Sequence, residues 1–292
     1  MKKLALQLPV LLVGGPILLS LLVASAPSQD ESPAGRRELP VKPILHEAPR
    51  KPAESPDVTT ATTMEHLAGE DPVRFLELCL ERYRQEVKGY RCILQKQERI
   101  AGKLQPRETI EVYFREDPHS VLMHWQHGAR KAEGALFVLG ENHGKMLARP
   151  SGSLARRIVG DVVERDVDGS DARQSGRYTL SQFGIRKGTE RTVAAWKASR
   201  QRGKLQVEYL GEQSVKEAGD RNCYKLRRTY EAPEADGVTE LTIYVDKETL
   251  LQVGSVLKGD NGQLIGEYFW RDIQLNPTFS PGQFERDALT PP

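Results

Sequence analysis

The sequence predicts an α+β protein built as a single curved antiparallel sheet with helices packed on its concave face. Apolar and polar residues alternate with a period of two over residues 108–115, which is typical of a strand with one apolar face. The flanking strand-like segments, 90–100 and 120–126, are joined to it by connections too short for a parallel crossover. An apolar stripe with helical spacing precedes this meander, at residues 73–87.

The charge balance restricts the kind of partner. The 292 residues include 42 basic and 40 acidic side chains, for a formal charge of +2. Lys2 and Lys3 account for that excess, so the rest of the chain is formally neutral. Phosphate binding needs a basic footprint, and its absence argues against nucleic acid as a partner.

Residues 1–26 have the composition of an export signal. Two lysines precede a mostly apolar run, residues 4–23, and the small-residue pattern Ala24-Ser25-Ala26 follows. Two outcomes stay open, a cleaved signal peptide or an uncleaved N-terminal membrane anchor. Pro27 disfavours cleavage, and the apolar run is about long enough to span a bilayer. In either case we expect an exported protein, periplasmic or anchored to the membrane with its body outside the cytoplasm.

Residues 27–70 are expected to form a disordered, proline-rich linker. They carry seven of the 18 prolines and show no sustained apolar periodicity, so they cannot bury enough surface to offset the entropy of ordering. We expect this linker to act as a spacer. The folded domain is expected to occupy residues 71–287, followed by a short tail, 288–292.

Each element of the domain has its own signal. Asp71 and Pro72 predict the start of the first helix, and Gly89 its C-cap. After the meander, residues 135–139 are apolar at every position, which predicts a strand covered on both faces. The remaining predicted elements are a strand at 145–148, helical segments at 153–159 and 179–199, and strands at 205–211, 223–230, 240–245, 250–258 and 263–275. Residues 160–174 are predicted to be a loop.

No segment has the spacing of a known catalytic, metal or nucleotide motif, so the sequence predicts no catalytic residue, no metal ligand and no cofactor. Three weaker patterns have ordinary alternatives. Glu98 and Glu111 are considered as an acid/base pair across the first hairpin, or as surface partners of basic residues. His124 and His127 are three apart, which puts them on opposite faces of a strand. Residues 164–169 resemble a calcium loop without its closing glutamate, or are a solvated acidic loop.

A basic pair, Arg156-Arg157, lies on the short predicted helix. It is interpreted either as a contact for anionic lipid headgroups or as ordinary surface charge.

The three cysteines divide into two groups. Cys92 and Cys223 lie on predicted strands, and thiols in an oxidising compartment tend to pair, so we expect a Cys92–Cys223 disulfide. Cys79 lies on the apolar helical stripe and is expected to be a free, buried thiol. The alternative is that all three are buried and reduced.

Apolar residues on neighbouring strands define a candidate ligand-binding face. They are Ile110, Val112, Phe114, Val121, Met123, Trp125 and Ile243. One interpretation is that these residues are ordinary core beneath the first helix. The other is that the helices leave a slot above them, which suits an apolar ligand.

Several segments carry a family resemblance, among them KQERIAGKLQPRETIEVYFREDPHSVLMHW and YFWRDIQLNPTFSPGQF. Over roughly residues 72–284 the chain resembles a domain of unknown function found in exported bacterial proteins. More distantly it is similar to the periplasmic lipoprotein carriers of the LolA and LolB type. That similarity implies a half-barrel: a curved antiparallel sheet wrapped around helices, with an apolar cavity for acyl chains.

The resulting hypothesis is a non-enzymatic cell-envelope protein that binds an acyl chain or other apolar ligand in the concave face of its sheet. Its partners would be a lipid or lipoprotein, and a membrane surface or envelope protein. Two alternatives stay open, a structural or protein-interaction module tethered by its spacer, and a hydrolase of unknown type.

Overall fold

The computed structural model of this chain describes residues 58–234 and 236–290. The predicted export signal and residues 27–57 of the predicted linker lie outside the described residues. Among the helices of the described part, none has the length and apolar character needed to cross a membrane.

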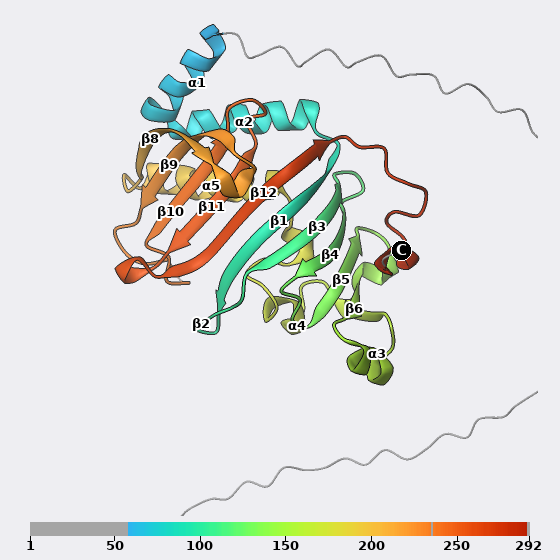
Figure 1. Cartoon of the computed structure of the whole chain (residues 1–292). Helices are drawn as coiled ribbons and strands as arrows, with labels where there is room; N and C mark the ends of the chain where they lie inside the picture. The colour runs from blue at the N-terminus through green and yellow to red at the C-terminus, as the bar shows by residue number, and fades with distance from the viewer. Residues whose placement is uncertain (1–57, 235, 291–292) are drawn as a thin grey trace, which may run out of the picture. The chain divides into compact units, whose positions relative to one another are not determined.

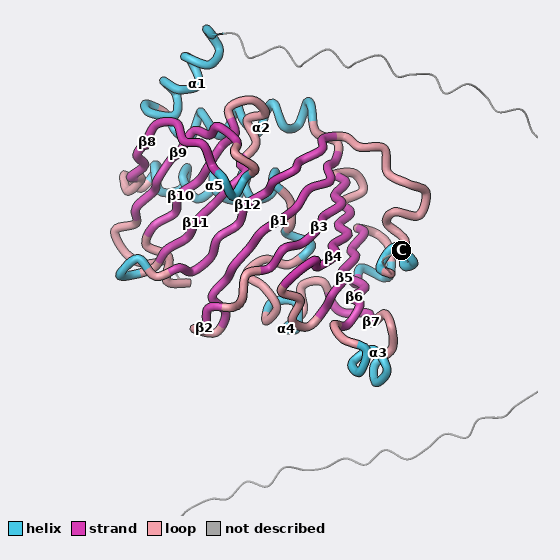
Figure 2. The backbone as a smooth tube through the Cα atoms, viewed as in Figure 1, coloured by secondary structure: helices cyan, strands magenta, loops and turns pink. Residues whose placement is uncertain are grey.

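The described part is built on one curved antiparallel sheet with helices on its concave face, which confirms the predicted fold class (Figure 1). The strands lie side by side in the order β7-β6-β5-β4-β3-β1-β12-β11-β10-β9-β8, and the short β2 pairs only with β1 (Figure 2). Their bounds are β1 Gly89–Ile100, β2 Lys103–Leu104, β3 Glu108–Arg115, β4 Ser120–His127, β5 Ala132–Val138, β6 Lys145–Pro150, β7 Val163–Asp166, β8 Gln206–Val215, β9 Arg221–Thr229, β10 Glu240–Asp246, β11 Gln252–Lys258 and β12 Leu264–Leu275.

The sheet consists of two meanders joined by one long-range strand pair. Strands β3–β7 follow β1 on one side, and strands β8–β11 precede β12 on the other. Within the β1–β12 pair, Tyr90 lies opposite Leu275 and Glu98 lies opposite Gly266. Gly89 is the first residue of β1. A side chain is excluded at this position, because a Cβ would lie 2.6 Å from the Phe114 carbonyl oxygen. The residue expected to cap a helix therefore serves the close approach of two strands.

Three helices cover the concave face. Helix α2 (Pro72–Glu86) buries Phe75 and Leu76, and Phe75 meets the Tyr224 ring of β9 edge to face at 5.4 Å. Helix α5 (Ile185–Gln201) packs beside α2 and over β11. Helix α1 (Val58–Glu70) contacts α2, β8 and β9. The other helices are α3 Ser153–Val159, α4 Ser170–Arg173, η1 Asn142–Gly144, η2 Leu180–Gln182, η3 Lys216–Ala218, η4 Asp260–Gly262 and η5 Arg286–Leu289.

The C-terminal segment covers the opposite face of the sheet at β4–β6. Leu122, Leu136 and Leu147 point to that face and pack with Phe284 and Leu289. Residues 135–138 are therefore buried on both faces, as predicted, whereas Leu139 at the end of the predicted strand lies beyond β5 and is exposed. Residues 288–292 were expected to be a tail. Leu289 is fully buried, so the folded body extends at least to that residue.

Two other expectations about loops differ from the structure. The linker was expected to extend to Glu70, but residues 58–70 form α1, and Met64 and Ala68 are buried against the body. These residues lack a long apolar stripe, so their composition does not reveal that Met64, Leu67 and Ala68 pack against the body. The predicted loop at residues 160–174 contains β7, which extends the sheet by one strand, and α4.

The predicted Cys92–Cys223 disulfide is wrong: all three cysteines are free and buried. Cys92 lies on β1 and Cys223 on β9, with β12, β11 and β10 between them. Four inter-strand steps amount to about 19 Å along the sheet, far beyond the roughly 7 Å between Cα atoms that a disulfide can bridge. The strand signals were correct, but strand order cannot be obtained from them.

We predict that Asp71→Ala lowers the free energy of unfolding by about 1 kcal/mol, because it removes the N-cap of α2. The Asp71 carboxylate accepts a hydrogen bond from the Arg74 backbone N–H at 3.0 Å. It also lies 3.0 Å from Arg200, an exposed ion pair that contributes little. Urea denaturation would measure the difference.

Asp71→Asn is the matched control, since it retains a capping oxygen and loses only the charge. It is expected to unfold close to wild type. A loss in the asparagine variant as large as in the alanine variant would show that the ion pair, and not the cap, stabilises the helix start.

Candidate functional site

A cavity of about 590 Å³ lies between the concave face of the sheet and the segment that runs from α4 through η2 into α5. Binding sites for small molecules commonly have volumes of about 300–1,000 Å³. The cavity is therefore the principal candidate site in the described part of the chain.

The floor of the cavity is a row of apolar side chains that crosses the strands. The strand register sets this row, because Leu94 lies opposite Ile110, Ile110 opposite Trp125, and Met123 opposite Ala135. Ala148 lies opposite Ala135 and continues the row onto β6. Each strand contributes only one or two side chains, so the floor cannot be seen in any single segment of sequence.

On the other side of β1, the floor continues through β12 and its neighbours. Tyr268 and Trp270 of β12 line the cavity, together with Ser255 and Leu257 of β11 and Leu241 of β10. The Trp270 indole N–H and the Gln252 side-chain oxygen are buried behind this wall and have no hydrogen-bond partner among the described residues.

The roof is formed by η2 and the first turns of α5. Gly184 has a φ of +123°, and a Cβ there would lie 3.0 Å from the Phe114 ring, so only glycine allows this approach. Phe114 also stacks on Tyr90 and contacts Phe183, which closes this end of the cavity. His119 fixes the roof from below, with Nε2 at 3.0 Å from the Leu180 carbonyl oxygen. A carbonyl can only accept, so Nε2 carries the proton.

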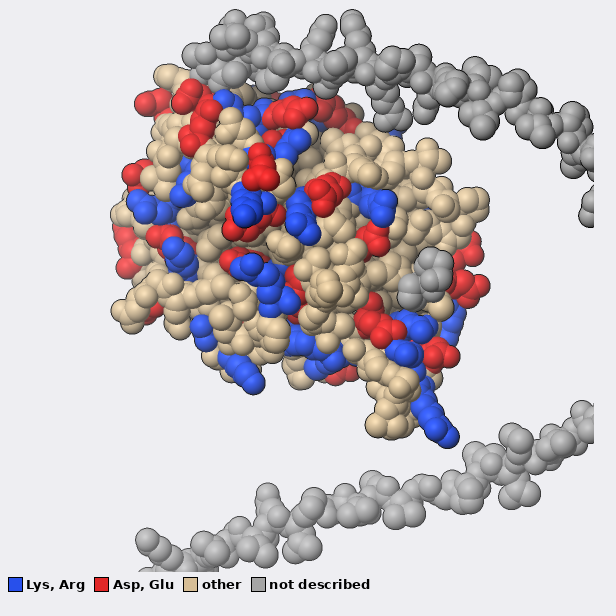
Figure 3. Space-filling view, viewed as in Figure 1, with Lys and Arg blue, Asp and Glu red and all other residues tan. Residues whose placement is uncertain are grey.

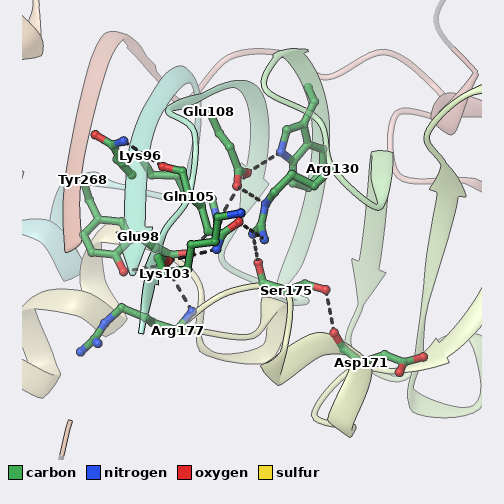
Figure 4. Close-up of polar contacts among 12 residues, drawn as sticks. Lys96, Glu98, Lys103, Gln105, Glu108, Arg130, Asp171, Ser175, Arg177 and Tyr268 are labelled. Carbon is green, nitrogen blue, oxygen red and sulfur yellow. Dashed lines mark hydrogen bonds and ion pairs between the residues drawn. The ribbon is translucent and has the colours of Figure 1, made fainter. Parts of the chain in front are cut away.

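The opposite end of the cavity is polar (Figure 4). Lys96 Nζ lies 3.0 Å from a Glu98 oxygen and 3.6 Å from a Glu108 oxygen, so one ammonium group bridges two buried carboxylates. The Tyr268 hydroxyl donates to Glu98 at 2.6 Å. Burial raises the pKa of Glu98, but the Lys96 charge and the hydrogen bonds from Tyr268, Lys96 and the Arg177 backbone N–H lower it by more. The net pKa of Glu98 lies below its usual value.

A second set of contacts joins this polar end to the floor. The Trp125 indole N–H donates to Glu108 at 2.6 Å, and the Arg130 guanidinium donates to Glu108 at 3.3 Å. Arg130, in the connection between β4 and β5, also donates to the Ser175 carbonyl at 2.7 Å and so holds the loop that precedes the roof. These contacts fix the Trp125 ring, which is only partly buried, as part of the wall.

The mouth of the cavity is marked by lining residues that are also exposed. They are Lys131, Tyr178, Gln182, Ala195, Glu234 and Asp236. Arg191 lies beside them on α5, with its guanidinium 4.3 Å from the Tyr178 ring centre. It donates to the Gln182 carbonyl at 2.8 Å and has no carboxylate ion-pair partner among the described residues.

The structure divides the sequence-predicted ligand face into two groups. Ile110, Met123 and Trp125 line the cavity. Val112, Phe114 and Val121 share its face of the sheet but are core residues beyond its closed end, and Ile243 is core beneath α2. Part of that face therefore lines a cavity and part is core, and ligand binding by the first group stays a prediction.

Sequence reasoning missed the β12 and roof residues. The predicted ligand face includes no residue of the last strand, yet Tyr268 and Trp270 of β12 line the cavity. Both faces of β12 are covered, one by the cavity and one by η3, so its alternation does not show which face is concave. The sequence does contain a signal for this face, because Tyr268 and Trp270 are two residues apart and therefore lie on the same side of the strand.

The weaker patterns form no site in the described part of the chain. Glu98 and Glu111 do not face each other, because Glu111 accepts from Arg91 and Tyr113. In the acidic loop, Asp168 accepts hydrogen bonds from Thr179 and Ser181. Among the residues described, no group of three or more histidine, cysteine, aspartate or glutamate side chains is placed to hold a metal ion.

Comparison with known families assigns the chain. The model of the family described as "Protein of unknown function (DUF1571)" matches residues 87–289, and the chain belongs to this family. The comparison with curated proteins finds no match.

Solved structures give distant similarities. A LolA superfamily protein from Nitrosomonas europaea is 10% identical, with 73% of this chain and 98% of that chain covered and a TM-score of 0.33. The Mycobacterium tuberculosis lipoprotein LppX is 9% identical, with 73% and 100% covered and a TM-score of 0.38. A chain of the Pseudomonas aeruginosa MucA/MucB complex is 18% identical, with 75% and 62% covered and a TM-score of 0.43. With TM-scores below 0.5, these similarities assign no function to this chain.

We predict that the protein loses stability as the pH falls below about 6.5, in part because of His119. Burial lowers the pKa of this imidazole, and its Nδ1 has no partner, so protonation would place an unpaired cationic N–H in the core. The unfolded state then binds the proton more tightly than the folded state. Stability conferred by the neutral imidazole is present above the unfolded pKa and is lost as the pH falls.

Urea midpoints measured at about pH 7.5 and about pH 5.5 would test this. His119→Gln keeps a donor for the Leu180 carbonyl but does not titrate in this range, so it should show a smaller difference between the two midpoints. An unchanged difference would assign the effect to other groups, such as His124, whose pKa burial also lowers.

Proposed function

We propose that this member of the DUF1571 family binds an acyl chain or another elongated apolar ligand in the cavity between its sheet and α5. The observation that carries the proposal is the cavity itself. Side chains from eight strands line a volume of about 590 Å³ beneath the roof.

Apolar surface that faces an open cavity is surface that a ligand can bury. Transfer of apolar area from water contributes about 25 cal/mol per Å², so a chain that covers the partly exposed lining residues Trp125, Met146 and Phe183 gains binding free energy from each contact. The floor is elongated because it crosses neighbouring strands from β6 through β1 to β10. This shape suits an extended chain.

The polar end supports a ligand that has one polar group. The Lys96, Glu98 and Glu108 side chains satisfy one another, so they form a wall that needs no ligand. Arg191 lines the cavity without a carboxylate ion-pair partner among the described residues, so its guanidinium is available to the polar group of a ligand. A few polar groups of this kind are what orients a ligand in a mostly apolar site.

We place this activity outside the cytoplasm. The support is in the sequence, where two lysines, an apolar run and small residues at 24–26 precede a proline-rich segment. A cavity protein on such a spacer would work at the cell envelope, where lipids and lipoproteins are its available ligands.

The mouth of the cavity offers a matched pair of substitutions on α5. Ala195 lines the mouth, whereas its neighbour Ala194 is exposed and does not line the cavity. We predict that Ala195→Trp weakens binding of a fluorescent fatty-acid probe by at least about tenfold, because a bulky ring occupies the entrance. Ala194→Trp should bind the probe as wild type does. Thermal unfolding should be nearly unchanged in both, since both sites are exposed.

Fluorescence titration of the full chain would give the result. Saturable binding to the wild type that is lost only in Ala195→Trp supports the proposal. The proposal fails if the wild type shows no saturable binding, or if the two tryptophan variants bind the probe equally well.

A further inference from the structure

Helix α3 lies at the edge of the sheet between β6 and β7, and none of its residues lines the cavity. Three of its seven residues are aliphatic and exposed: Leu154 by 72%, Ile158 by 74% and Val159 by 50%. In Figure 3 the corresponding corner is a projection of uncharged atoms with basic atoms along it. Elsewhere in the described part only Leu104, Leu139 and Tyr178 are large apolar side chains with comparable exposure.

The helix is oriented with its polar side toward the protein. Successive residues are about 100° apart around a helix, so Arg156 lies nearly opposite Leu154 and Ile158. Arg156 donates to Glu133 at 2.7 Å and to the Pro150 carbonyl at 3.2 Å. Glu133 also accepts from Arg149 at 2.7 Å. These contacts hold the arginine side of α3 against the sheet edge and turn its aliphatic side to solvent.

The two arginines of the pair Arg156-Arg157 therefore have different surroundings. Arg156 is bound to Glu133 and also lies 3.8 Å from Asp161. Arg157 is exposed and has no hydrogen-bond or ion-pair partner among the described residues. The charges in contact around α3 compensate one another except at Arg157, which lies about 60° from Leu154 on the helix surface. An aliphatic face flanked by an unpaired arginine is typical of helices at a membrane interface.

We propose that α3 docks this protein onto a bilayer that contains anionic lipids. Leu154 and Ile158 insert at the level of the headgroups and upper acyl chains, and Arg157 contacts the phosphates. The size of the patch favours a bilayer over a protein partner. A stable protein interface buries about 800 Å² on each side, far more than two aliphatic side chains provide. A protruding helix needs only these few side chains to enter a bilayer.

The test uses the full chain and a signal that is local to α3, because the apolar N-terminal segment can itself meet vesicles. The three native cysteines are buried, so an introduced surface cysteine can be labelled selectively. Ser153→Cys places an environment-sensitive fluorophore on α3, and Ser214→Cys places the same label on the exposed edge strand β8 at the other end of the sheet. Vesicles are made of phosphatidylcholine alone or with added phosphatidylglycerol, and both carry a lipid-attached quencher.

We expect the label at position 153 to be quenched by the vesicles, more strongly with phosphatidylglycerol, and the label at position 214 to be unaffected. Leu154→Asp with Ile158→Asp should weaken vesicle binding by α3 at least about tenfold, since two buried aliphatic contacts are lost. Leu139→Asp, at an aliphatic residue 60% exposed elsewhere, should change nothing. Arg157→Gln should remove most of the gain from phosphatidylglycerol. Thermal unfolding confirms that each variant is folded.

Equal quenching at positions 153 and 214, or quenching that survives the double aspartate substitution, would overturn the proposal. Self-association that size-exclusion chromatography detects in the wild type and not in the double variant would also overturn it, and would assign α3 to an interface between copies of this chain.

Discussion

The pairing of β1 with β12 is the constraint on which the rest of the structure depends. These strands are more than 160 residues apart, and they join two antiparallel meanders into one sheet. Specific contacts fix the pair at both ends. Asn276 accepts from the Lys88 backbone N–H at 2.7 Å, and the Arg99 side chain donates to the Leu264 carbonyl at 3.0 Å. Without this pair neither meander alone is wide enough to form the floor of the cavity, which takes residues from both.

Buried charge is concentrated at the same seam. Lys96 and Glu98 of β1 meet Tyr268 of β12 on one side and Glu108 of β3 on the other. Charges removed from water are costly unless each is paired and hydrogen-bonded, and here every member has at least one partner. The network gives the junction a single register, because a shift of one residue would turn these groups to the opposite face. It also ends the apolar floor with a polar wall.

The sequence was most informative where structure is local. Residues 108–115 and 153–159 form a strand and a helix with the predicted bounds, since alternation and helical spacing act within a few residues. It was least informative where strand order decides the outcome. The separation of Cys92 from Cys223, the inward face of Tyr268 and the division of the apolar face at Phe114 all follow from which strands are neighbours. The roof, with Gly184 over Phe114, depends on contacts between segments about 70 residues apart.

The account rests on a cavity that holds an apolar ligand, and native mass spectrometry of the full chain extracted gently from cells tests this most directly. It predicts a population whose mass exceeds that of the polypeptide by the mass of one lipid-like molecule, which organic extraction would release and identify. A folded protein that carries only the mass of its polypeptide, in preparations where added fatty acid also produces no adduct, would contradict it.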